Sequence, residues 1–100
     1  MLSATSIKGT RIRLSDERWA HIAEGHPEMA GNRNEVLLTI TTPDFVLEGA
    51  KDELLAVRFV RQDKALVVVY KENKNDGFVL TAYFTTRTNK LLERKIIWKK

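Results

Sequence analysis

Two histidines, His21 and His26, are the only side chains of their type in the chain, and they lie five positions apart. Histidine can act as a general acid or base near neutral pH. On one helix this spacing would separate the two side chains by about 140°, because each residue turns the helix by about 100°. Helices that bind a metal use spacings of about three or four residues, so a two-histidine metal site is disfavoured.

A metal-dependent hydrolase with both histidines and Glu24 or Glu28 as ligands is an alternative that this spacing argues against. The chain has no cysteine, which removes disulfide scaffolds, thiolate zinc sites and cysteine nucleophiles together. We therefore expect chemistry without a metal and without a cofactor.

His26 is expected where a first helix stops. Ser15 has the character of an N-cap, and the helix is expected from about Asp16 to Glu24. Gly25 suits a left-handed cap, and Pro27 cannot continue the helix. His26 would then have an extended conformation before the proline, so its direction is independent of the helix face. The plain alternative is that His26 only caps the helix and that the other histidine is a surface residue.

A second group of candidates lies on a strand expected from Phe78 to Thr86, where alternation divides the side chains between two faces. The apolar set is expected to pack against helices: Phe78, Leu80, Ala82 and Phe84. The other set contains hydroxyl groups and is expected to line an open groove: Val79, Thr81, Tyr83 and Thr85. The plain alternative is an ordinary exposed strand, since threonine and tyrosine are good strand formers.

The cation beside this hydroxyl strand depends on the register of the neighbouring strands. One register has Glu72 opposite Gly77 and Arg61 opposite Lys64, and it adds Tyr70 and two cations to the open face. A slip of one residue would bring other cations there instead. Four cations therefore stay open as partners of the strand: Arg58, Arg61, Lys64 and Lys71.

The composition is that of a basic globular domain. The chain has 100 residues, a net charge of +4 and a pI of about 9.6. We expect one domain over residues 1–100, with a loose N-terminal arm over residues 1–9. The positive charge favours partners that carry phosphate. No apolar run is long enough to span a bilayer, and the first residues lack the apolar run of a signal peptide, so we expect no membrane partner and a cytoplasmic location.

The remaining pattern predicts the other elements of the fold. It indicates a strand over residues 11–14, a second helix that begins after Asn32 and ends before Pro43, and strands over 45–47, 53–61 and 65–72. Residues 88–100 are expected as a helix, with an edge strand as the alternative. Together these elements define an α+β fold with two N-terminal helices packed on one face of an antiparallel sheet of about four to five strands.

Two segments together resemble a known family. Leu14 to Ile22, followed by Gly25-His26-Pro27-Glu28, is similar to the opening of phage- and toxin-associated nucleases of the barnase–EndoU–colicin–RelE (BECR) fold. Val79-Leu80-Thr81-Ala82-Tyr83 resembles their late strand with a Thr-x-Tyr element. The resemblance covers residues 11–87. One departure lies at Gly25, where related sequences often carry an arginine.

The resemblance implies a metal-independent ribonuclease, in which the ribose 2′-hydroxyl attacks the adjacent phosphate and leaves a 2′,3′-cyclic phosphate. Because the reaction needs a base for this hydroxyl and an acid for the leaving oxygen, the resemblance implies His26 as the leading acid or base and His21 as its partner. It further implies that Lys71 or Arg58 stabilises the phosphate and that Thr81 and Tyr83 form hydrogen bonds to it or to the ribose. The other substrate-binding candidates are Arg61, Thr85 and Arg87.

Such a domain is expected to be the toxin of a toxin–antitoxin pair or a mobile-element effector, with RNA and a protein antitoxin as partners. The alternative is a non-catalytic RNA- or protein-binding domain on the same fold. That alternative predicts salt-sensitive binding of RNA without cleavage.

Overall fold

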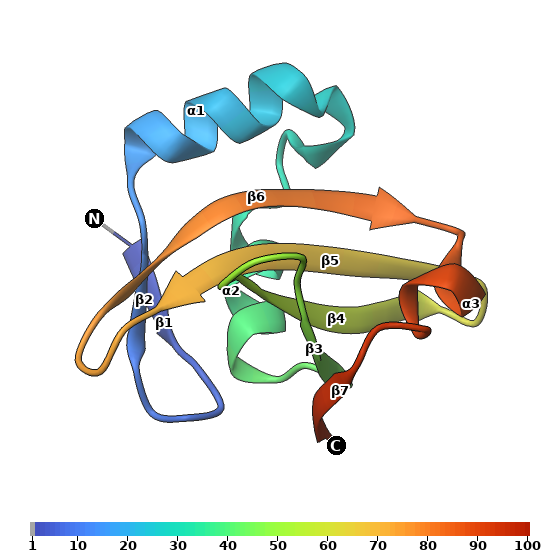
Figure 1. Cartoon of the computed structure of the whole chain (residues 1–100). Helices are drawn as coiled ribbons and strands as arrows, with labels where there is room; N and C mark the ends of the chain where they lie inside the picture. The colour runs from blue at the N-terminus through green and yellow to red at the C-terminus, as the bar shows by residue number, and fades with distance from the viewer. Residues whose placement is uncertain (1) are drawn as a thin grey trace.

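One sheet forms the centre of the molecule, and its strands come from both ends of the chain (Figure 1). The computed structural model describes residues 2–100. The strands of this part of the chain are β1 (Leu2–Thr5), β2 (Arg11–Leu14), β3 (Phe45–Glu48), β4 (Leu54–Arg61), β5 (Lys64–Glu72), β6 (Gly77–Thr85) and β7 (Ile96–Lys99). They lie in the order β1-β2-β6-β5-β4-β3-β7, and only β2 and β6 are parallel neighbours.

This sheet corrects the expected architecture. The protein is α+β, but an antiparallel sheet of four to five strands is wrong, because the sheet has seven strands and is mixed. The segment expected as a loose arm contains β1, which pairs with β2; Met1 lies outside the described residues. The expected C-terminal helix is a short helix, α3 (Thr88–Leu91), followed by the edge strand β7. The pattern does not identify β1 or β7 because both are edge strands with mostly exposed side chains, so neither carries a buried apolar face.

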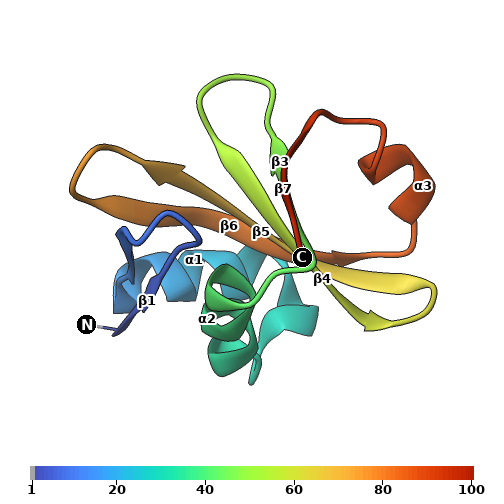
Figure 2. The same cartoon turned by 90° about the horizontal axis from the view of Figure 1, so that it is seen from below.

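Helices α1 (Asp16–Gly25) and α2 (Arg33–Thr41) lie on one side of the sheet, and α3 lies on the other side (Figure 2). At the start of α1, Ser15 Oγ accepts a hydrogen bond from the Arg18 amide at 3.1 Å, as the N-cap predicts. Gly25 is the last residue of α1 and does not have the expected left-handed conformation. The 3-10 helix η1 (Pro27–Met29) follows at once, so the proline rather than the glycine ends α1. No helix within residues 2–100 is both long and apolar enough to cross a membrane.

The larger apolar core lies between the sheet and the elements α1, η1 and α2. Its fully buried side chains include Met29 from η1, Val36 and Ile40 from α2, and Tyr70 from β5. Burial of these side chains provides the main favourable free energy of folding, and it fixes α1 and α2 on this face.

A polar network holds α2 to β4 beside this core. The Arg58 guanidinium donates hydrogen bonds to Thr39 Oγ1 at 3.1 Å and to Glu35 Oε2 at 3.0 Å. Asn32 lies at the N-cap of α2, but its side chain forms no capping hydrogen bond there. Asn32 followed three residues later by Glu35 is a pattern typical of a capping box, but Glu35 contacts the sheet instead.

The opposite face of the sheet carries a second apolar cluster, so it is not open across its whole width. Its buried members are Leu47, Leu55, Val57, Ala65, Val67 and Leu91. Leu91 comes from α3, which covers one end of this face. The groove expected on this face is therefore restricted to the region between the end of β6 and α3.

A bulge in β6 decides which of its side chains face which side. The turn between β4 and β5 and the turn between β5 and β6 both have the expected register. Further along the pairing of β5 with β6, however, Val69 pairs with Thr81 and Tyr70 pairs with Val79. Leu80 is therefore an extra residue in β6. Val79 turns into the helix-side core while Phe78 is 38% exposed on the other face, which reverses the places expected for these two residues.

The observed register also changes which residues lie on the face of the sheet opposite the helices. Tyr70 lies in the helix-side core instead of the groove, and Lys71, the next residue of β5, lies on the opposite face. Arg58 lies on the helix side, where it binds α2.

Candidate functional site

Helix α1 runs alongside one edge of β6 (Figure 1). β2 pairs only with Gly77 and Phe78 at the start of β6, so in residues 2–100 the rest of this edge has no strand partner. Near the start of α1, Arg18 Nη1 donates to the Leu80 carbonyl oxygen at 3.5 Å. Beyond the end of α1, the His26 ring lies 6.0 Å from the Tyr83 ring, measured between centroids. The helix therefore carries one of the two histidines to the hydroxyl strand.

The direction of His26 follows from the residues that end α1. Its amide donates to the Ile22 carbonyl oxygen at 2.8 Å, and its φ of −134° takes the chain off the helical path. Its Nδ1 lies 3.6 Å from Oε2 of Glu28. This separation is longer than a hydrogen bond, so the carboxylate acts on the ring through its charge. The His26 side chain is 39% exposed, so a substrate can reach it.

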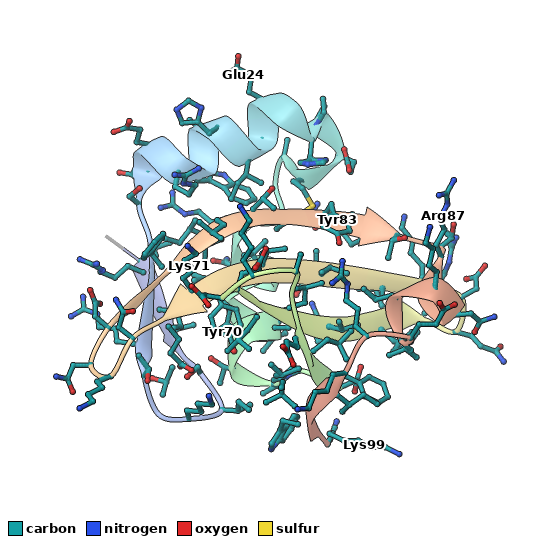
Figure 3. All side chains as sticks on the ribbon, viewed as in Figure 1. Glu24, Tyr70, Lys71, Tyr83, Arg87 and Lys99 are labelled. Carbon is teal, nitrogen blue, oxygen red and sulfur yellow. The ribbon has the colours of Figure 1, made fainter. Side chains whose placement is uncertain are left out.

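An open pocket of about 380 Å³ lies between the end of β6 and α3. Its lining residues are Tyr83, Thr85, Arg87, Lys90, Leu91, Glu93 and Arg94. Thr85 Oγ1 accepts a hydrogen bond from the Arg87 amide at 3.0 Å, which fixes the chain where it leaves β6. Figure 3 shows Tyr83 and Arg87 at the same end of the sheet, with Lys71 at the other end.

The net charge of the side chains that line this pocket is positive. The pocket has three cations, Arg87, Lys90 and Arg94, and one carboxylate, Glu93. The five ion pairs among the described residues all use other side chains. An excess of cations in a pocket attracts anions, and a guanidinium is complementary to phosphate in charge and geometry.

Tyr83 connects His26 to this pocket, and its hydroxyl stays protonated at neutral pH. Burial raises the pKa of Tyr83 above its usual value, and the positive charge of Arg94 offsets part of that rise. A protonated phenol can donate a hydrogen bond to a phosphate or ribose oxygen.

The structure brings together four of the predicted site residues: His26, Tyr83, Thr85 and Arg87. Thr81 precedes Tyr83 by two residues and shares its face of β6, but it does not line the pocket. Lys90, Glu93 and Arg94 line the pocket and were not among the predicted residues. The signal that could have found them is the dense run of charged residues that follows the hydroxyl strand.

The other predicted residues lie elsewhere. His21 is exposed on α1 and lines a separate hollow on that helix. Arg58 binds α2, and Arg61 pairs with Asp63 in the turn between β4 and β5. Lys71 lies near the far end of the sheet (Figure 3). None of these four side chains lies at the pocket beside Tyr83.

Within residues 2–100, no three His, Asp or Glu side chains gather closely enough to hold one metal ion. The two histidines and a glutamate, which were considered as a ligand set, are therefore not assembled as one. Comparisons of the chain with protein-family models, with curated proteins and with solved structures find no match. The fold and the site together define a basic α+β domain in which one histidine lies near a pocket lined by three cations.

Proposed function

We propose that this domain is a metal-independent endoribonuclease. The observation that carries the proposal is the contact of His26 with Tyr83 at the rim of a pocket lined by three unpaired cations. Cleavage of RNA by its own 2′-hydroxyl needs a proton acceptor, a proton or hydrogen-bond donor, and positive charge around the phosphate. This region of the surface offers all three kinds of group together.

His26 is the general base in this proposal. Its Nε2 takes the proton of the 2′-hydroxyl, and the negative charge of Glu28, on the Nδ1 side, stabilises the imidazolium that forms. The bond between O2′ and phosphorus forms as the bond between phosphorus and O5′ breaks. The leaving oxygen takes a proton from the Tyr83 phenol, which regains one from the imidazolium of His26.

The pocket cations bind the phosphate in place of Lys71 and Arg58. The charge that gathers on the two non-bridging oxygens is stabilised by Arg94, whose charge already acts on Tyr83, and by Arg87. These arginines also supply the cationic role that related sequences give to the position of Gly25.

We further propose that the domain acts on RNA in the cytoplasm as the toxin of a toxin–antitoxin pair or as a mobile-element effector. The support is the resemblance of its two segments to toxin-associated nucleases and its net charge of +4. A protein antitoxin would block cleavage by covering the pocket at the end of β6.

The proposal is tested by incubating purified protein with single-stranded RNA in the presence of EDTA. The expected result is cleavage into fragments that end in a 2′,3′-cyclic phosphate, because the 2′-hydroxyl is the nucleophile. Intact RNA, or cleavage that requires an added divalent ion, would contradict the proposal.

A non-catalytic RNA-binding domain is the second candidate. It is favoured by the presence of a single histidine at the pocket, since His21 lies in a separate hollow. This candidate predicts that RNA binds to the pocket in a salt-dependent way and is recovered uncut.

A further inference from the structure

A further hollow lies at the start of β6, at the opposite end of α1 from His26. It has a volume of about 240 Å³ and is lined by Arg13, Ser15, Arg18, Phe78 and Val79. Phe78 is 38% exposed, more than any other Phe, Tyr or Trp within residues 2–100. Neither the core nor the proposed catalytic groups account for this exposure.

The exposure of Phe78 results from the bulge at Leu80. The bulge turns Val79 into the core and leaves the ring of Phe78 on the surface. Aromatic side chains are normally buried because they carry a large apolar area, so an exposed ring is suited to contact with a partner. The bases of single-stranded nucleic acids are partners of this kind, because every base has a flat face that can stack on an aromatic ring.

Two guanidinium groups flank this ring. Arg18 forms no ion pair within the described residues, and its side chain contacts the Leu80 carbonyl oxygen. Arg13 binds Asp76 through Nη2, but its Nε is buried without a hydrogen-bond partner. Cations beside an aromatic ring match the alternation of phosphate and base in a nucleic acid strand.

The strand β6 joins this hollow to the proposed catalytic pocket. Phe78 and Tyr83 pair with Lys71 and Val67 of β5, which are four residues apart, so they are separated by about 14 Å at the rise of a β-strand. That distance is about four nucleotides at a stacked spacing of 3.4 Å. Along this path α1 contributes Arg18 near its start and His26 beyond its end.

We propose that the hollow is a second nucleotide subsite, in which a base of the RNA stacks on Phe78 while Arg13 and Arg18 bind neighbouring phosphates. This inference rests on the proposed ribonuclease function and specifies its substrate. The substrate is single-stranded RNA that extends several nucleotides beyond the cleaved bond. A duplex does not fit, because its bases are stacked on one another and cannot lie on Phe78.

The test compares two substrates and two variants. The substrates are a single-stranded RNA of about ten nucleotides, long enough to reach both sites, and the dinucleotide at which that RNA is cut. Phe78→Ala is expected to lower kcat/KM for the longer RNA by about 5- to 100-fold, which is the effect of losing one stacked base. It is expected to leave kcat/KM for the dinucleotide unchanged, and Phe78→Trp is expected to keep the activity on both.

Ile97→Ala is the matched control, because Ile97 is 39% exposed and lies on β7 at the far edge of the sheet. It is expected to leave both rates unchanged. An equal loss on both substrates for Phe78→Ala, or no loss on either, would overturn the subsite.

Failure of the proposed function would be visible separately, as the absence of cleavage by the unchanged protein. In that case the subsite is tested by fluorescence anisotropy with a labelled single-stranded oligodeoxyribonucleotide of about ten nucleotides. Weaker binding by Phe78→Ala than by Ile97→Ala supports the subsite, and equal binding by the two variants overturns it.

Discussion

At the scale of single residues, His26 and His21 differ in the backbone that surrounds them. His21 lies within α1 and stays exposed on the helix surface, whereas Pro27 forces His26 out of the helical path. The sequence predicts this difference, since the proline is local. It does not predict that Tyr83 is the neighbour of His26, because that contact depends on how α1 lies against β6.

The Tyr83 hydroxyl can be tested without removing the ring. Tyr83→Phe keeps the contact with His26 but loses the proton and hydrogen-bond donor, so kcat for RNA cleavage is expected to fall by about 10²- to 10³-fold. The melting temperature is expected to stay near that of the unchanged protein, which circular dichroism would show. Full activity of this variant would remove Tyr83 from the proposed mechanism.

At the scale of elements, the long strands and the first two helices follow from the sequence, and the way they combine does not. Alternation and turn residues predict β4, β5 and β6 to within about two residues, as is usual for long periodic segments. The parallel contact of β2 with β6 involves only two residue pairs, and no local pattern could indicate it. The bulge at Leu80 also escapes prediction, because it follows from packing on both faces of the sheet.

Substitution of two arginines distinguishes a residue that stabilises the fold from a residue that binds RNA. Arg58→Ala removes the bonds from β4 to α2 and is expected to destabilise the fold by about 1–2 kcal/mol, with little change in RNA affinity. Arg94→Ala is expected to weaken RNA binding with little change in stability. Urea unfolding and fluorescence anisotropy on both variants would check this, and the reverse pattern would contradict the assignment of the pocket.

At the scale of the whole molecule, the two sides of the sheet differ in how much of their surface the apolar core covers. The helix side holds the larger core, whereas the other side has the second apolar cluster in its middle and the basic pocket at its end. The sequence predicts a basic, hydroxyl-bearing face. It places too many residues there, because Tyr70 and Arg58 belong to the helix side.

Tyr70 gives the molecule an expected sensitivity to alkaline pH. Burial, and then the charge of Glu72, raise the pKa of Tyr70 well above the usual value near 10. The unfolded chain therefore releases this proton at a lower pH than the folded protein. The stability that depends on the protonated hydroxyl is complete below about pH 10 and is lost as the pH rises toward the raised pKa.

Tyr70→Phe removes this ionisation together with a buried hydroxyl that has no hydrogen-bond partner within residues 2–100. The variant is expected to be as stable as the unchanged protein at pH 7, or more stable by about 1 kcal/mol. Between pH 9 and pH 11 its melting temperature is expected to fall less than that of the unchanged protein. Part of the fall remains in the variant, because the pKa of Tyr83 is also raised. Identical melting curves across this range would contradict the account of Tyr70.

The central claim is that one histidine, His26, performs acid–base chemistry at the end of β6. The most direct measurement compares kcat/KM of His26→Ala and His21→Ala on the same single-stranded RNA in EDTA, with folding checked by circular dichroism. We predict a loss of at least about 100-fold for His26→Ala, as for removal of a general base, and a rate near that of the unchanged protein for His21→Ala. Equal rates for the two variants would contradict the claim.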